Sequence, residues 1–282
     1  MKTILVPVDF SKNSLNAVEY AAAIAKKEKA KMILLHAYHF SPPTSDVPLP
    51  GDVVHSLRAE ATKKLNALCV EITQIKKIKC EYLVKYDFAV NSILEMSKEK
   101  KADLIVMGTK GASGIKEIFL GSNTAKVIEN TKIPVIAVPE KAAFSAIKKI
   151  TYATDYHASD FAVLKKVALL AKSFRAKINV IHAANEELTP ETEDMLLDRF
   201  KSKAKKKVPY PKISYGIRYG THLEKILQEH VSKEKPDLIA MSTQRRNLLE
   251  KFFGTSATQK MAYHSSIPLL TFHHKQASAV FI

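Results

Sequence analysis

The sequence has very little cysteine and no long hydrophobic run, and each absence excludes a class of protein. Cys69 and Cys80 are the only cysteines, and their spacing fits no metal site, so we expect reduced thiols and a cytoplasmic protein. No run of about 18 apolar residues is present, so we expect no transmembrane helix. The chain starts directly with the apolar residues Ile4, Leu5 and Val6 instead of the regions of a signal peptide, so we do not expect export.

Acidic residues are also scarce, because the 282-residue chain has 28 Asp and Glu against 44 Lys and Arg, a net charge of +16. Such an excess occurs in proteins that bind nucleic acid or anionic membranes, and also in proteins whose lysines simply face solvent. The basic residues here are scattered and are not interleaved with aromatic residues. Their densest run, from Lys201 to Lys207, ends a predicted helix and precedes Val208-Pro209-Tyr210-Pro211. We therefore favour a solvated surface and expect neither nucleic acid nor a membrane as a partner.

The chain contains an internal repeat. The stretch KMILLH at residues 31–36 is matched by KINVIH at residues 177–182, 146 positions later, and the same offset relates Asp9 to Asp155. A second offset, 134 positions, relates Asp103-Leu104-Ile105 to Asp237-Leu238-Ile239. Two long similar halves indicate a tandem duplication with each half near the usual size of a domain. We predict two domains, residues 1–142 and residues 146–282.

Short apolar runs alternate with amphipathic stretches in each half. In the first half the nearly continuous apolar runs suit parallel strands that are buried on both faces. They lie at residues 4–8, 32–37, 80–84, 104–107 and 135–138. The stretches between them, such as residues 13–29, have apolar residues at helical spacing. The order predicts an α/β fold of two tandem doubly wound domains, each with a five-stranded parallel sheet flanked by helices.

A glycine-rich string follows the fourth apolar run. It reads Gly108-Thr109-Lys110-Gly111 and, after nine further residues, Gly121-Ser122, where a helix is predicted to start. Glycine lets the backbone turn tightly and approach an anion closely. The start of a helix offers free N–H groups and a partial positive charge. A strand, a glycine loop and a helix start in this order are able to hold phosphate.

Asp9 lies at the end of the first predicted strand. In a doubly wound sheet, ligands bind beyond the carboxyl ends of the strands where the winding direction reverses. If the first and fourth strands are neighbours there, Asp9 lies beside the glycine loop. Its carboxylate would then accept hydrogen bonds from a ribose hydroxyl or an adenine amine. Alternatively, Asp9 only accepts from the backbone N–H groups of the turn at Ser11 and Lys12.

These residues resemble the universal stress protein family. The resemblance rests on Pro7-Val8-Asp9, the glycine string from Gly108 to Ser122 and Ile133-Pro134-Val135, and it covers nearly the whole chain as a tandem member. It implies ATP at the first half, with adenine and ribose near Asp9 and the phosphates on the glycine loop. The nucleotide-binding residues that it implies are Pro7, Val8, Asp9, Ala37, Met107, Gly108, Lys110, Gly111, Gly121, Ser122, Asn123 and Thr124.

The second half departs from this pattern. Asp155 is kept, but the loop reads Ser242-Thr243-Gln244-Arg245, so both leading glycines are lost, and only Gly254-Thr255 remains of the second part. Side chains at Ser242 and Arg245 would restrict the backbone and fill space that phosphate needs. We therefore predict that the second half binds ATP weakly or not at all.

The remaining candidate residues do not indicate a catalytic or metal-binding site. His36 and His182 recur at equivalent positions of both halves, so we expect them to pack structurally, and we find no catalytic or metal-binding set. The leading hypothesis is an ATP-binding stress-response or regulatory protein, with ATP bound with or without magnesium and at most weak hydrolysis. The alternatives are a nucleotide hydrolase, an adenylyl-transferring enzyme or a nucleotide-free interaction protein. We expect the tandem chain to form a homodimer.

Overall fold

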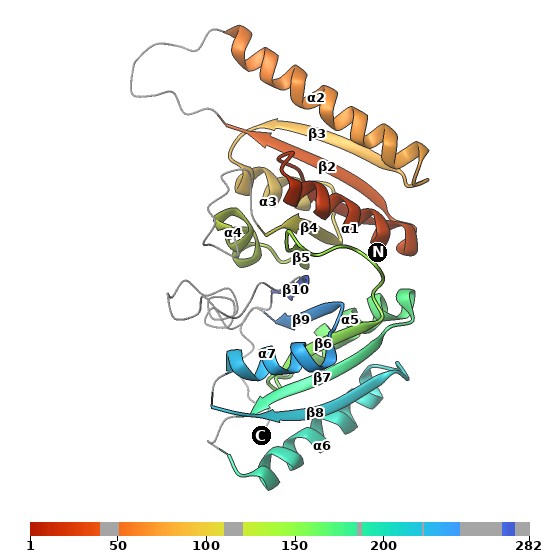
Figure 1. Cartoon of the computed structure of the whole chain (residues 1–282), viewed down its shortest axis with the longest axis vertical. Helices are drawn as coiled ribbons and strands as arrows, with labels where there is room; N and C mark the ends of the chain where they lie inside the picture. The colour runs from red at the N-terminus through yellow and green to blue at the C-terminus, as the bar shows by residue number, and fades with distance from the viewer. Residues whose placement is uncertain (40–50, 110–120, 185–187, 222, 243–266, 274–282) are drawn as a thin grey trace. The chain divides into compact units, whose positions relative to one another are not determined.

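A computed structural model of the chain describes residues 1–39, 51–109, 121–184, 188–221, 223–242 and 267–273 (Figure 1). Contacts between residues divide the chain into two compact units, with the changeover at Glu140 and Lys141. Each unit has the five parallel strands that the sequence predicts, with helices on both faces of the sheet.

The first unit alternates strands and helices along the chain. Its strands are β1 (Thr3–Pro7), β2 (Lys31–Tyr38), β3 (Cys80–Tyr86), β4 (Leu104–Gly108) and β5 (Val135–Val138). Its helices are α1 (Lys12–Glu28), α2 (Gly51–Gln74), α3 (Ala89–Glu99) and α4 (Ser122–Asn130). The strand order across the sheet is β3-β2-β1-β4-β5, and every pair is parallel.

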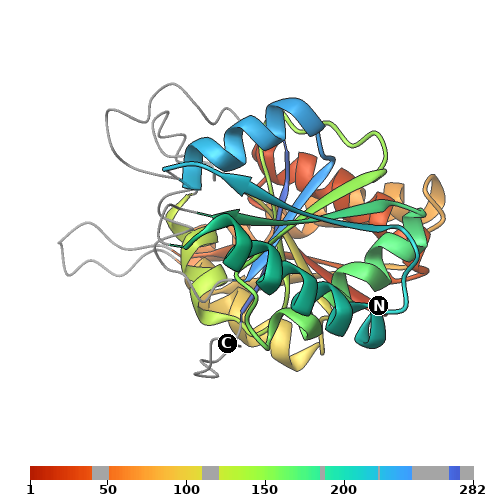
Figure 2. The same ribbon diagram turned by 90° about the horizontal axis from the view of Figure 1, so that it is seen from below.

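The second unit repeats this plan. Its strands are β6 (Lys149–Thr154), β7 (Lys177–Ala184), β8 (Ile213–Tyr219), β9 (Leu238–Ser242) and β10 (Leu269–Phe272), and its helices are α5 (Asp160–Phe174), α6 (Pro190–Lys207) and α7 (Leu223–Glu234). The strand order is β8-β7-β6-β9-β10. Figure 2 shows α5 and α6 on one face of this sheet and α7 on the other.

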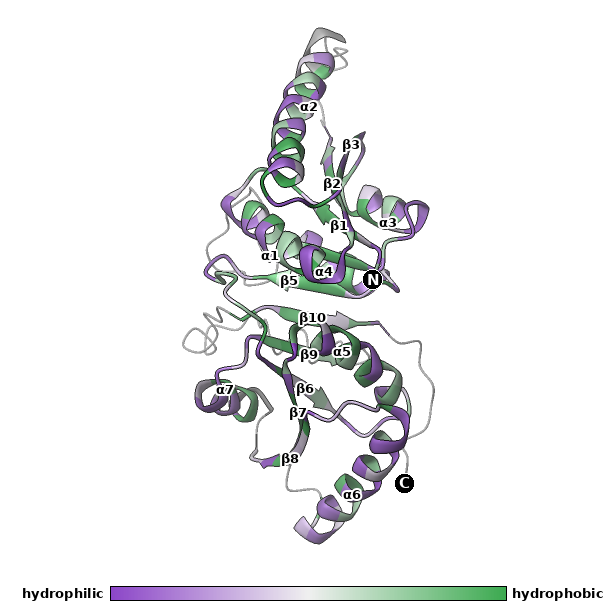
Figure 3. Ribbon diagram, turned by 90° about the vertical axis from the view of Figure 1, so that its right-hand side faces the viewer, coloured by the Kyte–Doolittle hydropathy of each residue, from purple (hydrophilic) through white to green (hydrophobic). Residues whose placement is uncertain are grey.

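The central strands β1, β4 and β9 are almost entirely apolar because both of their faces are covered. Ile4, Leu5 and Val6 of β1 are completely buried, and Leu238 and Ala240 of β9 are equally inaccessible. In Figure 3 these central strands are hydrophobic, whereas α1, α2 and α6 show both hydrophilic and hydrophobic residues along their length. The sheet therefore forms the core of each unit, and each helix buries one side against it.

Local signals fix where the helices begin and end. Ser11 caps α1, because its Oγ accepts a hydrogen bond from the N–H of Ser14, and Lys29 ends the helix in the left-handed conformation at φ 52°. Thr189 caps α6 in the same way, and Pro190 occupies the first turn. The basic run of the sequence lies in the last turn of α6, where positive side chains interact favourably with the partial negative charge of the helix end.

Candidate nucleotide-binding edge

The strand order reverses between β1 and β4 in the first unit. Ile4 pairs with Leu104 and Leu5 pairs with Ile105, so the two strands run side by side in parallel. Their carboxyl ends therefore emerge at the same edge of the sheet, with Asp9 just beyond β1 and Gly108 at the end of β4. The first and fourth strands are thus neighbours, as a ligand site at this edge needs, because ligands of such sheets bind where the strand order reverses.

Asp9 has the turn role that the sequence left open. Its Oδ1 accepts a hydrogen bond from the N–H of Ser11 at 3.0 Å and another from the Ser11 hydroxyl at 2.6 Å. The N–H of Asp9 donates to Oγ of Ser14 at 3.3 Å. These bonds fix the chain between β1 and α1, and they hold the half-buried Asp9 carboxylate at the edge of the sheet.

An aromatic residue in an unusual backbone conformation follows Asp9. Phe10 has φ 62°, in the left-handed region that side chains other than glycine seldom adopt. Its ring lies 4.9 Å from the ring of His36, and the ammonium group of Lys64 lies 5.4 Å from the Phe10 centroid. Such a conformation persists only where the surroundings impose it, so this turn is held firmly in place.

His36 packs structurally, as the sequence predicts. Its Nδ1 lies 2.7 Å from the backbone oxygen of Val8, and a carbonyl only accepts, so Nδ1 carries the donated proton. His182 makes the same bond to the oxygen of Thr154 at 2.9 Å in the second unit. Both histidines therefore tie the end of one strand to its neighbour.

Gly108 allows β4 to approach the start of α1 closely. A Cβ atom added to Gly108 would lie 3.0 Å from the backbone carbon and oxygen of Asn13 and 3.1 Å from its Cβ. These are backbone atoms that cannot simply turn aside. Packing against α1 therefore favours glycine at position 108, a reason that the sequence pattern alone does not reveal.

Helix α4 starts directly beside the end of β4. The hydroxyl of Thr124, which is buried, donates to the backbone oxygen of Gly108 at 2.8 Å, and the N–H of Gly121 donates to the oxygen of Thr109. Ser122 and Asn123 are exposed in the first turn, where helix geometry leaves N–H groups without acceptors inside the helix. Thr124 thus has a structural bond, whereas Ser122 and Asn123 present the start of α4 to solvent.

The structure brings most of the predicted site residues to one edge. Val8 and Met107 are buried at the ends of β1 and β4, and Pro7 and Ala37 are half-buried at the ends of β1 and β2. Lys110 and Gly111 lie outside the described residues. The described part of the edge therefore combines a carboxylate, a close-packed glycine and an exposed helix start.

In the second unit the strand order also reverses, between β6 and β9, but different side chains occupy the edge. Asp155 stays at the end of β6, next to β9, while Asp160 occupies the position of Ser14 in the repeat. Asp160 is buried and accepts hydrogen bonds from the hydroxyls of Tyr152 at 2.9 Å and Thr154 at 2.7 Å and from the N–H of His157 at 3.1 Å. No motif indicates Asp160, which the 146-residue offset aligns with the serine at position 14.

A second buried carboxylate lies near the end of β7. Glu193 is 2% exposed, and its Oε2 lies 3.5 Å from Nε2 of His182. The ring of Tyr156, which has φ 61°, stacks on His182 at 4.3 Å. Burial, followed by the charge of Glu193, raises the pKa of the Tyr156 hydroxyl. Neither Glu193 nor this stack is signalled by a motif, because the contacts form only when the end of β6, β7 and α6 pack together.

The loop that differs most between the halves is described only at its start. Ser242 takes the place of Gly108 at the end of β9, and its hydroxyl is buried without a hydrogen-bond partner among the described residues. Arg245, Gly254 and Thr255 lie outside those residues. Three carboxylates, Asp155, Asp160 and Glu193, thus lie at the described edge of the second unit, and their negative charge disfavours a phosphate there.

Comparison with known proteins gives the family. The model of the universal stress protein family matches residues 1–139 and again residues 146–273. A universal stress protein of Methanocaldococcus jannaschii is 36% identical over 143 residues, which cover 49% of this chain and 81% of the relative. One of Thermus aquaticus is 31% identical over 137 residues, covering 49% and 98%.

A solved structure that covers almost the whole chain agrees with the fold. A universal stress protein from Archaeoglobus fulgidus has a TM-score of 0.73 at 18% identity, covering 97% of both chains. A universal stress protein solved in complex with cAMP is 32% identical, covers 49% of this chain and 96% of its own, and has a TM-score of 0.37. No helix in the described ranges has the length and apolar character to cross a membrane. With one match of the family model in each half, this chain belongs to the universal stress protein family.

Proposed function

We propose that the first unit binds ATP at the edge where β1 and β4 lie side by side, and that the protein is a nucleotide-binding stress-response or regulatory protein. The observation that carries the proposal is the meeting of Asp9, Gly108 and the start of α4 at this edge.

Each end of the nucleotide has a suited group at this edge. The carboxylate of Asp9 accepts hydrogen bonds, which suits the hydroxyls of a ribose or the amine of adenine. The apolar side chains of Val8 and Ala37 suit an adenine ring, and the exposed N–H groups of Ser122 and Asn123 suit phosphate. Lys110 and Gly111, beyond the described residues, would complete the phosphate loop. Magnesium would enter on the triphosphate, since Mg²⁺ commonly keeps water and phosphate ligands.

The second unit, in this proposal, binds no ATP. Its edge has the buried carboxylates Asp160 and Glu193, and Ser242 replaces the first loop glycine. Buried negative charge near a phosphate raises the energy of the bound state. In this proposal, the second unit stabilises the fold and contacts other proteins.

We propose ligand binding without efficient catalysis, with hydrolysis of ATP weak at most. The measurement is the release of ADP or AMP, followed by chromatography under the conditions in which ATP binds. Protein-dependent turnover that ends when Asn123 is replaced by Glu would instead indicate a nucleotide hydrolase or an adenylyl-transferring enzyme.

Isothermal titration calorimetry of the full chain with ATP and Mg²⁺ tests the binding. Asp9→Asn keeps an oxygen for the Ser11 bonds but removes the charge, so we expect ATP to bind about tenfold more weakly. Asp155→Asn is the matched change in the second unit, and we expect affinity within about twofold of the unmodified protein. No heat of binding for the unmodified protein, or equal affinities for Asp9→Asn and the unmodified chain, would contradict the proposal.

We also propose that the tandem chain forms a homodimer in the cytoplasm, a location that its two free thiols suit. Light scattering after size-exclusion chromatography measures the mass. A mass of about twice 31.4 kDa is expected, and a monomer at all concentrations would refute the dimer.

A further inference from the structure

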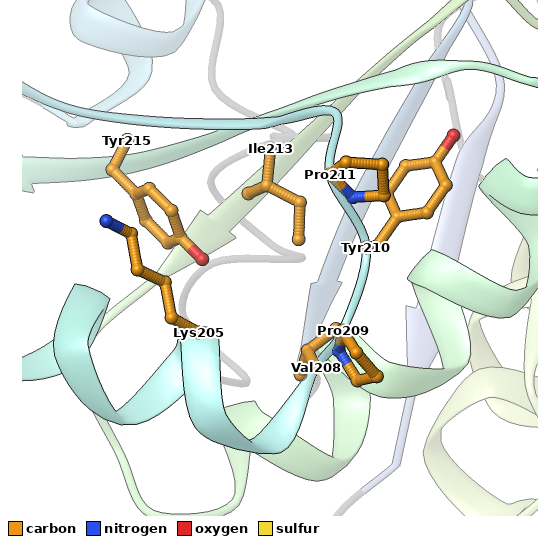
Figure 4. Close-up of a pocket in the computed structure, with 7 residues that line it drawn as sticks. All are labelled: Lys205, Val208, Pro209, Tyr210, Pro211, Ile213 and Tyr215. Atoms are coloured by element: carbon orange, nitrogen blue, oxygen red, sulfur yellow. The ribbon is translucent and has the colours of Figure 1, made fainter.

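A cavity of about 420 Å³ lies in the second unit, at the end of the sheet opposite to the carboxyl ends of its strands. It is formed where α6 ends and the chain turns into β8. Its apolar lining comes from Val208, Pro209, Pro211 and Ile213 (Figure 4). The volume falls in the range of small-molecule sites, which are mostly apolar with a few polar groups.

The turn that forms the wall of this cavity is rigid. Val208 ends α6 with a non-helical backbone at ψ 85°, and its N–H donates to the oxygen of Ala204 at 2.8 Å. The hydroxyl of Tyr210 donates to the backbone oxygen of Ala176 at 2.6 Å. Pro209 and Pro211, on either side of Tyr210, fix their own φ angles. A ligand would therefore meet a wall that is already in place, which lowers the cost of binding.

Two polar groups line the cavity beside this wall. Figure 4 shows Lys205 and Tyr215 next to each other on the side away from Tyr210. Lys205 has no acidic neighbour one turn earlier, because Lys201 and Ser202 occupy those positions. Lys201 instead pairs with Asp198 at 3.7 Å. Within the described ranges Lys205 makes no ion pair and the hydroxyl of Tyr215 makes no hydrogen bond, so two donors remain available.

The corresponding turn of the first unit is built differently. Residues 75–79, between α2 and β3, contain no proline and place the apolar Ile75 in solvent at 73% exposure. Lys76 of this turn pairs with Glu19. The proline-bounded turn that lines the cavity is thus found in the second unit and not at the described turn of the first.

We propose that this cavity binds a small molecule with an apolar ring and one carboxylate. The ring would lie against the two prolines and Ile213, and the carboxylate would accept hydrogen bonds from the Lys205 ammonium and the Tyr215 hydroxyl. Lys205, Pro209 and Pro211 are exposed, so the site is open to solvent, and its one cation beside apolar side chains suits a single negative charge.

NMR titration of the full chain with 2-naphthoate tests the site, with the uncharged 2-naphthylmethanol as the matched probe. We expect saturable shifts at Val208 and Ile213 with 2-naphthoate, and binding of the alcohol weaker by at least about tenfold, or 1.4 kcal/mol. Lys205→Met keeps the length of the side chain and removes its charge, so the same loss is expected. Lys206→Met removes a neighbouring exposed charge outside the cavity, and affinity should stay within about twofold.

Several results would overturn the site. They are the absence of saturable shifts, equal binding of acid and alcohol, and equal affinities for Lys205→Met and the unmodified chain. Shifts confined to Val8 and Ala37 that ATP reverses would place the probe on the first unit instead. The Tyr215→Phe variant separates the two donors, and a loss of at least about threefold is expected for the missing hydroxyl.

Discussion

A carboxylate at the start of α4 should weaken ATP binding without unfolding the protein. Asn123 is exposed in the first turn of this helix, where the proposed phosphates lie. A glutamate there faces a phosphate charge at about 5 Å, which costs about 0.8 kcal/mol at the dielectric constant of water and about 3.3 kcal/mol at an effective value of 20. We therefore expect Asn123→Glu to bind ATP between about fourfold and several hundredfold more weakly.

The fold should tolerate this substitution, because an acidic residue at a helix start gains about 0.3–1 kcal/mol from the helix dipole. Ala162→Glu is the matched control, since Ala162 is exposed in the first turn of α5 and the change in net charge is identical. Calorimetry with ATP and thermal unfolding are measured for both variants at low and physiological salt. Equal ATP affinities for Asn123→Glu and Ala162→Glu would refute phosphate binding at α4.

Three further predictions concern the packing of the units. Gly108→Ala should lower the free energy of unfolding by about 1–3 kcal/mol in urea, because its Cβ meets the backbone of Asn13 at 3.0 Å, and unchanged stability would contradict that contact. Asp160→Ala should cost about 2–4 kcal/mol, because it orphans the buried hydroxyls of Tyr152 and Thr154, whereas a loss below about 0.5 kcal/mol would show that water replaces the carboxylate. Burial lowers the pKa of His230, so the folded state resists its protonation, and stability should fall as pH drops below the unfolded value of about 6.5. His230→Gln should reduce that loss in urea unfolding between pH 7.5 and 5.5, and equal slopes for both proteins would exclude His230 as its source.

Much of the fold could be predicted because periodicity is a local signal. Buried parallel strands are nearly continuous apolar runs, and the predicted run at residues 135–138 coincides with β5. The repeat then predicted the second sheet from the first. The ends of the helices are less predictable than the strands, because they depend on tertiary contacts and on capping, as Ser11 shows at the start of α1.

The candidate edge could be predicted only in part. Motif spacing correctly brought Asp9 and Gly108 to one place, and the recurrence of His36 and His182 correctly indicated packing. The packing that favours glycine at position 108 could not be predicted from the sequence, because it depends on the approach of Asn13, 95 positions earlier in the chain. The pairing of Glu193 with His182 was hidden although the two residues are close in sequence, since it forms only where the chain turns back from β7 into α6 and leaves no periodic trace in either segment.

The most direct test of ATP binding at the first unit is an NMR titration of the full chain with ATP and Mg²⁺. The account predicts saturable amide shifts at Val8, Asp9, Ala37 and Ser122, with Asp155 and Tyr156 of the second unit unchanged. Shifts at the ends of β6 and β9 alone, or no saturable shift anywhere, would contradict it.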